Sequence, residues 1–597
     1  MSGLQPGTSS SNRSSRRAGL ALFLTLLGLL ALRVPGFQVG LAFDDHVHQA
    51  VLDGAIDHPT MGPLSLYDFG RFADLRERAD AWGGYPFWVD EELEIRFFRP
   101  LASASLALDH ALFGDWAPGY HAVNLLLFGL LLLLARRLWV ELGLPPVTAL
   151  LALCIYGLED GSHSVVVGWI ANRNSLLEAV LVVCGLLIAS SGGGRGEART
   201  GRRLFLALAV TWLAVLTKES GIAGLLSLAV LLLMAPVAGL RATPLRLRRL
   251  FAAIAVGLAL LHPVLLFSAG YGSTSQFYAL PWRAPQSFLE HLSVHATVGL
   301  ATSLGPFSSD VAFMQPQLRP VLIAVALACL IAVARPLRRA LMESEAVRFL
   351  ACFGLLSFLP QLVAPPSDRL IFVPMLGFAP WIAVTLERLW RRGTSDRDAR
   401  AVRVGAIVLG FMVLPLSAFG SLAQQGGFSK LAGLSRDLLE RLPEELGTPL
   451  PRDIFFLQTP IALMALNPGP TFWAVHGEAP PRFWPLQAGR RSLEWTRTGA
   501  GTFELESLDE PFLGGPMEKL FRCTGGVPES GREYLAPGFR VVILDGGRRL
   551  KLELDGLEPE AAAFLAWDGE RWQGVPTPQI GEAVIIPEGK PPLPMVP

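Results

Sequence analysis

The stretch GYHAVNLLLFGLLLLLARRL, residues 119–138, decides the fold of this protein. Its centre, residues 125–135, is an uninterrupted apolar run, which is followed by two adjacent arginines. A helix that crosses a membrane needs about 20 predominantly apolar residues, and Lys and Arg concentrate on its cytoplasmic side. The stretch therefore predicts a transmembrane helix whose arginines lie in the cytoplasm and whose polar start, with His121 and Asn124, lies at the outer face.

The composition of the whole chain agrees with a membrane protein. Of its 597 residues, 51% are hydrophobic and only 17% are charged, whereas about 25% are charged in an ordinary soluble protein. The formal net charge is zero, so the charge balance gives no indication of a nucleic-acid partner. The five cysteines suggest no disulfide pair, and no group of Cys and His has the spacing of a zinc site.

Ten other stretches resemble the first one in length and apolarity, so we expect a mainly α protein with about eleven membrane spans. Basic residues cluster in every second connecting loop, which the positive-inside rule assigns to the cytoplasm. Residues 1–17 then form a disordered cytoplasmic N-terminus, and the protein is expected to be a multi-pass protein of the cell inner membrane. The predicted spans are 18–37, 119–138, 144–158, 174–191, 203–217, 220–238, 249–269, 319–335, 347–363, 370–388 and 403–421.

Two regions outside the membrane complete the predicted domain organisation. A large first outer loop, 38–118, belongs to a transmembrane domain that covers residues 18–421, and residues 422–597 form a periplasmic soluble domain that contains β-structure. In that domain, Asp545-Gly546 separates two β-rich runs, 539–544 and 549–554, which predicts a β-hairpin. Two interrupted apolar segments, 101–115 and 287–305, are expected at the outer interface or packed on the bundle.

The first candidate site residues are the adjacent acids Asp44 and Asp45, directly after the first predicted span. A carboxylate close to the bilayer can act as a general base, and its neighbour can orient it or help to hold a divalent cation. The alternative is that one of them caps the N-terminus of a following helix. His46 and His48 are two residues apart and do not share a helix face, which weakens a metal site made from all four residues.

Several cations lie at the outer ends of the other spans. Arg99 can bind a phosphate with two hydrogen bonds, or it can serve as an interface anchor. His121 and Asn124 lie on one helix face and can also hydrogen-bond a neighbouring helix. Arg173 follows a Trp-Ile pair, and Trp82, Trp88 and Trp169 could stack on sugars, although Trp is common at membrane interfaces.

The remaining candidates are two charged dipeptides. Lys218 and Glu219 lie in a tight outer turn and could simply neutralise each other, and Asp368-Arg369 precedes the tenth predicted span. Taken together, the outer loops offer four cations around one pair of acids. Such a convergent cationic site would stabilise the negative charge that develops on a departing phosphate.

At these positions the sequence resembles the GT-C superfamily of integral-membrane glycosyltransferases. Within it, the sequence is most similar to the transmembrane O-mannosyltransferases that carry tetratricopeptide repeats and to their bacterial relatives, which use polyprenyl-phosphate-linked sugars. The resemblance covers roughly residues 18–390. It rests on Asp44-Asp45, Phe98-Arg99-Pro100-Leu101, Leu112-Phe113-Gly114, Gly119-Tyr120-His121 with Asn124, Trp169-Ile170 with Arg173, Lys218-Glu219-Ser220-Gly221, and Asp368-Arg369 before Val373-Pro374.

The resemblance implies a polyprenyl-phosphate sugar donor and a glycan, lipid or protein acceptor at the outer face. It implies an inverting transfer with Asp44 as the base and Asp45 as its partner. Donor phosphate or the acid pair would be held by Arg99, Arg173, Lys218 and Arg369, with Glu219 and Asp368 beside them, and His121 and Asn124 would shape the pocket. No cofactor is certain, and participation of a divalent cation stays open.

The chain differs from the family pattern at a few positions. Asp160-Gly161 stands where relatives commonly have His-Pro, Val165 where they often have Glu, and Phe128 where they have a second His. No tetratricopeptide repeats are found. Two other functional classes therefore remain as alternatives: a transporter or flippase of lipid-linked saccharides, and a non-catalytic membrane scaffold with an outer binding domain.

Overall fold

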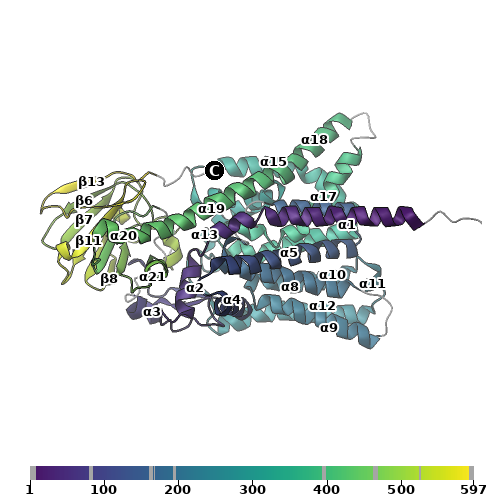
Figure 1. Ribbon diagram of the computed structural model, residues 1–597, viewed down its shortest axis with the longest axis horizontal. Coiled ribbons are helices and arrows are strands. Elements are labelled where there is room, and N and C mark those ends of the chain that lie inside the picture. The colour runs from purple at the N-terminus through teal and green to yellow at the C-terminus, as the bar shows by residue number, and fades with distance from the viewer. Residues whose placement is uncertain are drawn as a thin grey trace, which may run out of the picture.

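The computed structural model describes residues 8–79, 85–159, 166, 168–191, 197–392, 399–460, 468–515, 517–523 and 526–590. A bundle of long helices fills one end of the molecule and a β-rich unit fills the other (Figure 1). The protein is therefore mainly helical with a C-terminal β-sheet region, as the sequence predicted.

Seven helices in the described part are long and apolar enough to cross a membrane. All eleven predicted spans coincide with helices. Four of these helices are either shorter than a full membrane span or have basic residues within them or at one end. The seven spans are Arg17–Gln38, Ala117–Glu141, Ile170–Ser190, Leu245–Ser268, Arg319–Glu343, Glu345–Val363 and Val402–Leu446. The other four are α6 (Pro146–Leu158), α9 (Glu197–Val215), α10 (Ile222–Met234) and α17 (Met375–Arg392).

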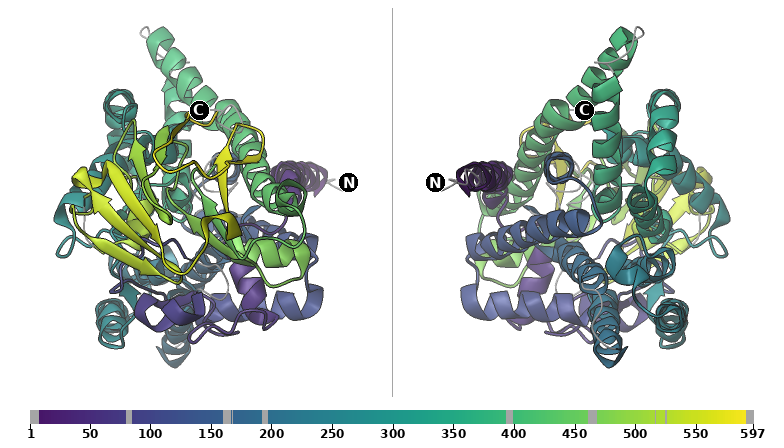
Figure 2. Two further views of the ribbon diagram at one scale, coloured as in Figure 1. Left: turned by 90° about the vertical axis from the view of Figure 1, so that its left-hand side faces the viewer. Right: turned by 90° about the vertical axis from the view of Figure 1, so that its right-hand side faces the viewer.

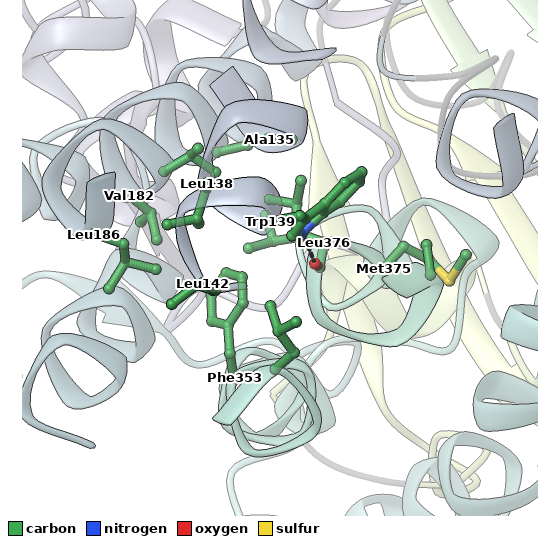
Figure 3. Close-up of a cluster of buried hydrophobic side chains, with 14 of the residues drawn as sticks. Ala135, Leu138, Trp139, Leu142, Val182, Leu186, Phe353, Met375 and Leu376 are labelled. Atoms are coloured by element: carbon green, nitrogen blue, oxygen red, sulfur yellow. Dashed lines mark hydrogen bonds between the residues drawn. The ribbon is translucent and has the colours of Figure 1, made fainter. Parts of the chain in front are cut away.

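The bundle is closely packed around one central helix, α8 (Arg173–Ser190), which is buried along most of its length. In its core, side chains from four helices interdigitate, and the indole N–H of Trp139 donates to the carbonyl of Leu376 at 3.1 Å (Figure 3). Gly377 allows two helices to touch, because a Cβ there would lie 2.2 Å from the Leu350 carbonyl oxygen. Small residues at such crossings are typical of membrane helix pairs. The helices that meet with α8 in this region are α5 (Ala117–Glu141), α16 (Glu345–Phe358) and α17.

The peripheral helices are exposed on most of their surface, as expected for contact with lipid. They are α1 (Thr8–Ala31), α12 (Leu245–Ser268), α15 (Arg319–Glu343), α18 (Ala399–Phe411) and α19 (Ser417–Glu440). A short helix on the side of the bundle where the spans end in arginines is α11 (Ala238–Arg241). At the opposite end, α4 (Pro100–Phe113) runs across the direction of the spans (Figure 1).

The predicted first outer loop, residues 38–118, folds against the end of the bundle opposite the arginine-rich ends of the spans (Figure 1). Its helices are α2 (Asp44–Leu52), α3 (Phe72–Ala79) and α4. A small antiparallel sheet joins this loop to the segment after α12, in the strand order β1 (Asp68–Arg71), β2 (Glu94–Arg96), β3 (Gly272–Ser273). The segment that follows contains α13 (Pro285–Val294), a π-helix (His295–Gly299) and α14 (Ser309–Met314), and it packs against α15.

The C-terminal unit contains two sheets in its described part. One is antiparallel, with the order β13-β6-β7-β10-β9-β8, and in the other β11, β4 and β5 are parallel and β12 is antiparallel. The hairpin predicted at Asp545-Gly546 is confirmed, because β9 pairs with β10 in antiparallel register. The strands are β4 (Asp453–Phe456), β5 (Arg482–Pro485), β6 (Leu493–Arg497), β7 (Thr502–Ser507), β8 (Glu533–Ala536), β9 (Phe539–Leu544), β10 (Arg549–Leu554), β11 (Ala562–Trp567), β12 (Trp572–Gly574) and β13 (Ala583–Ile586).

The β-rich unit is joined to the bundle by a continuous helix and by direct contacts. The predicted boundary at residues 421–422 lies inside α19, which runs from the bundle to the β-rich unit (Figures 1 and 2) and is followed by α20 (Leu442–Leu446). Helix α21 (Pro468–His476) packs on both α19 and α2. Asp90 of the first outer loop is buried beneath the unit, accepting hydrogen bonds from Arg532 at 2.6 Å and from the Cys523 backbone at 2.7 Å.

Candidate functional site

The predicted acid pair opens helix α2, and its two members have different surroundings. Asp45 is buried, and its two carboxylate oxygens accept hydrogen bonds from the backbone N–H groups of Ala42 at 3.0 Å and Ala171 at 2.8 Å. Burial raises the pKa of Asp45 to about 8, although both amides favour the ionised form. Asp45 therefore ties the start of α2 to the loop before α8.

Asp44 has no hydrogen-bond partner among the described residues and is only partly buried. Burial raises its pKa, while the charges of Arg369 and, more weakly, Arg99 lower it. The residue before it, Phe43, has a φ of 53°, a conformation that side chains other than glycine rarely adopt. Asp44 itself is less constrained than Asp45, whose two carboxylate oxygens both accept hydrogen bonds.

Two histidines on α2 add no positive charge near the acids. His46 and His48 are both buried, and burial lowers the pKa of His46 to about 4 and that of His48 to about 3. Both imidazoles are therefore neutral near pH 7. No group of three or more His, Cys, Asp or Glu side chains within the described ranges could hold a metal ion.

Two of the predicted cations lie beside carboxylates. The Arg99 guanidinium binds Glu219 with two nitrogens, the closest contact being 2.7 Å, and it also lies over the ring of Tyr67. Lys218 donates to Ser175 at 2.8 Å, and burial lowers its pKa while the nearby carboxylate of Glu178 opposes this. These two pairs make a nearly neutral cluster at the end of the bundle that the first loop covers.

Arg173 forms a fully buried network in which the predicted residue Asn124 takes part. Its guanidinium pairs with Asp109 at 2.5 Å and donates to Asn124 at 2.6 Å and to the Tyr120 carbonyl at 3.0 Å. Because Arg173 is 0% exposed, it holds α4, α5 and α8 together and does not face a ligand. His121 is also buried, and its ring lies 3.0 Å from the Gly40 carbonyl oxygen.

Asp368 and Arg369 have different surroundings: Asp368 is buried in contacts within the protein, whereas Arg369 is partly exposed. The buried Asp368 carboxylate accepts from the Ser309 backbone at 2.5 Å and from the Ser308 hydroxyl at 2.8 Å. Arg369 is partly exposed, its guanidinium lies 5.1 Å from the centre of the Trp169 ring, and it donates to Asn172 at 3.4 Å. Asp368 therefore fixes the 3-10 helix Asp368–Ile371, from which Arg369 extends.

The structure brings together Asp44, Arg99, Lys218, Glu219 and Arg369, which influence one another electrostatically. Asp45, Arg173, Asn124, His121 and Asp368 lie in the supporting contacts around this cluster. Of the three predicted tryptophans, only Trp169 lies in the cluster, whereas Trp88 is buried against the β-rich unit. Four positions named from the sequence lie outside the described residues: Trp82, Asp160, Gly161 and Val165. Phe128 lies in the apolar core.

Sequence reasoning missed three residues of the cluster. Glu178 is an acid inside a predicted span, which is by itself a signal for function because such residues are costly in a membrane. Tyr278 is close enough to Asp44, Arg99 and Arg369 for their charges to affect its pKa, which burial raises. Asn172 accepts a hydrogen bond from Arg369; the polar segment 169–174 contained it, but the sequence assigned it no role. The sequence had no signal for Tyr278, because its neighbours in the cluster belong to distant segments.

Comparison with known proteins gives only remote likenesses. No protein family model matches the chain, and no curated protein matches it either. Among solved structures, the oligosaccharyltransferase of Archaeoglobus fulgidus aligns at 11% identity and a TM-score of 0.44, over 78% of this chain and 63% of that one. The chain thus spans under two thirds of the length of that enzyme.

Two further solved structures are similar at the same level. The Archaeoglobus fulgidus oligosaccharyltransferase AglB, in complex with an inhibitory peptide and a dolichol-phosphate, aligns at 12% identity with a TM-score of 0.42, over 81% of this chain and 66% of that one. ArnT from Cupriavidus metallidurans bound to undecaprenyl phosphate aligns at 14% identity with a TM-score of 0.30, over 74% of this chain and 88% of that one. Identities and TM-scores this low assign no function to this chain.

Proposed function

We propose that this protein is an inverting membrane glycosyltransferase that moves a sugar from a polyprenyl-phosphate donor to an acceptor at the outer face of the membrane. The observation that carries the proposal is the difference between the two acids. Asp45 is occupied by two backbone amides, whereas Asp44 has no partner in the described part and lies near Arg369 and Arg99. A carboxylate kept accessible beside cations suits a general base that works next to an anionic donor.

The proposed reaction is a single displacement at the anomeric carbon of the sugar. The acceptor hydroxyl attacks the anomeric carbon of the sugar while the bond from that carbon to the phosphate oxygen breaks. The bonding electrons leave with the polyprenyl phosphate, and the acceptor proton passes to the Asp44 carboxylate. Because attack and departure occur on opposite faces of the sugar, the anomeric configuration inverts.

The partly buried surroundings of Asp44 favour this role. Desolvation raises the pKa of Asp44, which strengthens it as a base, while the charges of Arg369 and Arg99 lower that pKa. The supporting network of Arg173, Asp109 and Asn124 fixes the elements around it. We assign Arg173, Asn124, His121, Asp45 and Asp368 positioning roles.

The test places the full-length protein in proteoliposomes and supplies a panel of polyprenyl-phosphate-linked sugars. The measured quantity is the release of polyprenyl phosphate, which accompanies each transfer. Asp44→Asn should reduce release by at least about 100-fold, because general-base catalysis typically contributes 10²–10⁴-fold. Asp74→Asn is the matched control, since Asp74 is an exposed acid of the same outer loop. Equal release by wild-type protein and the Asp44 variant would overturn the proposal, as would the absence of release from every donor tested.

A further inference from the structure

Phe43, the residue before the proposed base, has a backbone conformation that depends on its surroundings. Its φ of 53° and ψ of −111° lie outside the regions that residues with a side chain ordinarily adopt. Such a conformation is strained and persists only where neighbouring contacts hold it. Because Phe43 directly precedes helix α2, its conformation sets the position of Asp44, the first residue of that helix.

Hydrogen bonds hold the backbone on both sides of Phe43. The Asp45 carboxylate accepts from the Ala42 N–H at 3.0 Å, and the Asp45 N–H donates to the Ala42 carbonyl at 3.0 Å. The His46 N–H donates to the Phe43 carbonyl at 3.2 Å. These bonds close the first turn of α2 around Asp44, so a change at Phe43 would move this turn.

Three aromatic rings pack around one point and hold the Phe43 side chain. The ring centres of Phe43 and Trp169 are 5.8 Å apart, those of Phe43 and Phe428 5.6 Å, and those of Trp169 and Phe428 5.9 Å. Phe43 meets the other two rings at 76° and 79° between ring planes, an edge-to-face arrangement that is favourable for aromatic pairs. Phe43 is therefore only 8% exposed.

The third ring comes from α19, far later in the chain. Two side chains one turn before Phe428 fasten this part of α19: Gln424 donates to the Asp368 carboxylate at 3.2 Å, and Gln425 donates to the Leu32 carbonyl at 3.0 Å. Residues three and four apart lie on one face of a helix. The position of the Phe428 ring is therefore set by the packing of α19 on the bundle, and not by the segment that contains the proposed base.

We propose that Phe428 is a positioning residue, which keeps Asp44 in place for proton transfer by holding the ring of Phe43. The inference rests on the proposed function, because that function gives Asp44 the role of the base. Phe428 has no group that can carry a proton, so it acts only through Phe43. A ring that served the stability of α19 alone would affect unfolding but not the rate constant of the folded protein.

The experiment measures kcat and KM for release of polyprenyl phosphate by the full-length protein in proteoliposomes, together with hydrogen exchange of the α2 amides. Phe428→Ala removes the ring, and Phe428→Tyr keeps it. Phe419→Ala is the matched control, because Phe419 is a phenylalanine of the same helix that is 68% exposed. All rates are measured well below the Tm of each variant, so that unfolded protein does not contribute.

We expect Phe428→Ala to lower kcat about tenfold with a nearly unchanged KM, since a misplaced base slows the chemical step and not substrate binding. Exchange of the α2 amides should become faster in Phe428→Ala, because the first turn of α2 loses its support. Phe428→Tyr and Phe419→Ala should behave as the wild type does. An unchanged kcat in Phe428→Ala, or an equal loss in Phe419→Ala, would overturn the positioning role.

A double-mutant cycle tests whether Phe428 acts through Phe43. Phe43→Ala should lower kcat by about as much as Phe428→Ala, and the double variant should be no slower than Phe43→Ala, because all three lose the same contact. A double variant about 100-fold slower than the wild type, as expected for two independent effects, would overturn the inference.

The inference and the proposed function fail in different ways, because hydrogen exchange reports the coupling between Phe428 and α2 without any substrate. If the wild type releases no polyprenyl phosphate but α2 exchanges faster in Phe428→Ala, the glycosyltransferase is rejected and the coupling stands. If Asp44→Asn is inactive while Phe428→Ala transfers sugar as the wild type does, the glycosyltransferase stands and the positioning role is rejected.

Discussion

Asp45 accepts a hydrogen bond from the backbone N–H of Ala171, 126 residues further along the chain, at 2.8 Å. This bond joins the helix that begins with the acid pair to the loop that contains Trp169 and Asn172. Two loops that are far apart in the sequence are therefore joined directly beside the proposed base.

Replacing Asp45 by Asn should lower stability without removing the proposed base. The amide has one oxygen where the carboxylate offers two, so one of the two backbone N–H groups would face an N–H₂ group. Loss of a buried partner costs about 1–3 kcal/mol. Thermal unfolding of the purified protein should show a lower Tm for Asp45→Asn and a nearly unchanged Tm for Asp44→Asn; an equal effect of both would contradict the assignment of roles.

The rate of transfer should rise with pH through a pKa above that of an ordinary aspartate. Asp44 must be ionised to accept a proton, and burial raises its pKa from the usual 3.8. Activity is then lost as the pH falls through the raised pKa. Arg369→Gln should move the inflection to higher pH, because it removes the charge that lowers the pKa of Asp44 most. A profile of kcat/KM between pH 4 and 9 measures both, and a flat profile would exclude Asp44 as the base.

Acid should destabilise the first outer loop. His46 and His48 are buried with pKa values of about 4 and about 3, against 6.5 in an unfolded chain. The unfolded state therefore binds more protons below pH 6.5, and stability falls there by about 1.4 kcal/mol per pH unit for each histidine. The raised pKa of Asp45, about 8, acts in the opposite direction, because the folded state then binds the extra proton as the pH falls. The test is therefore a comparison: from pH 7 to pH 5 the Tm of the wild type should change less favourably than that of a His46→Gln/His48→Gln variant. The same pH dependence of Tm in both proteins would refute this.

Asp109→Asn should be strongly destabilising. It leaves the fully buried charge of Arg173 without its carboxylate, and breaking such a pair costs about 3–5 kcal/mol. A double variant, Asp109→Leu with Arg173→Met, should recover much of the loss, because it removes both buried charges. The comparison of the two Tm values checks this, and a double variant less stable than Asp109→Asn would contradict it.

Asp90→Ala should loosen the β-rich unit from the first outer loop. It removes the acceptor of both Arg532 and the Cys523 backbone in a buried interface. Hydrogen exchange should increase in residues 85–93 and in β8 and β9. Arg540→Gln is the control, since its partners Glu533 and Glu553 are at the surface, where ion pairs contribute about 0–1 kcal/mol. Equal exchange in the two variants would argue against a docked unit.

Local patterns in the sequence were sufficient for the spans and the hairpin. Apolar stretches such as residues 125–135 form helices because a bilayer leaves the backbone no other partner, and Asp545-Gly546 turns because of its own backbone preferences. The number of full spans was not determined in this way. Four of the predicted helices, α6, α9, α10 and α17, are shorter than a full span or include basic residues.

The sequence by itself determined which residue types the outer face offers: an acid pair and a set of cations at the ends of the spans. Only the tertiary structure decided which of these cations pair with a carboxylate and which do not. Arg173 and Arg369 look alike in sequence, yet one is buried against Asp109 and the other lies open over Trp169. The reason is physical: the pairing of a charge depends on contacts between distant segments, whereas membrane insertion depends on the apolarity of one continuous segment.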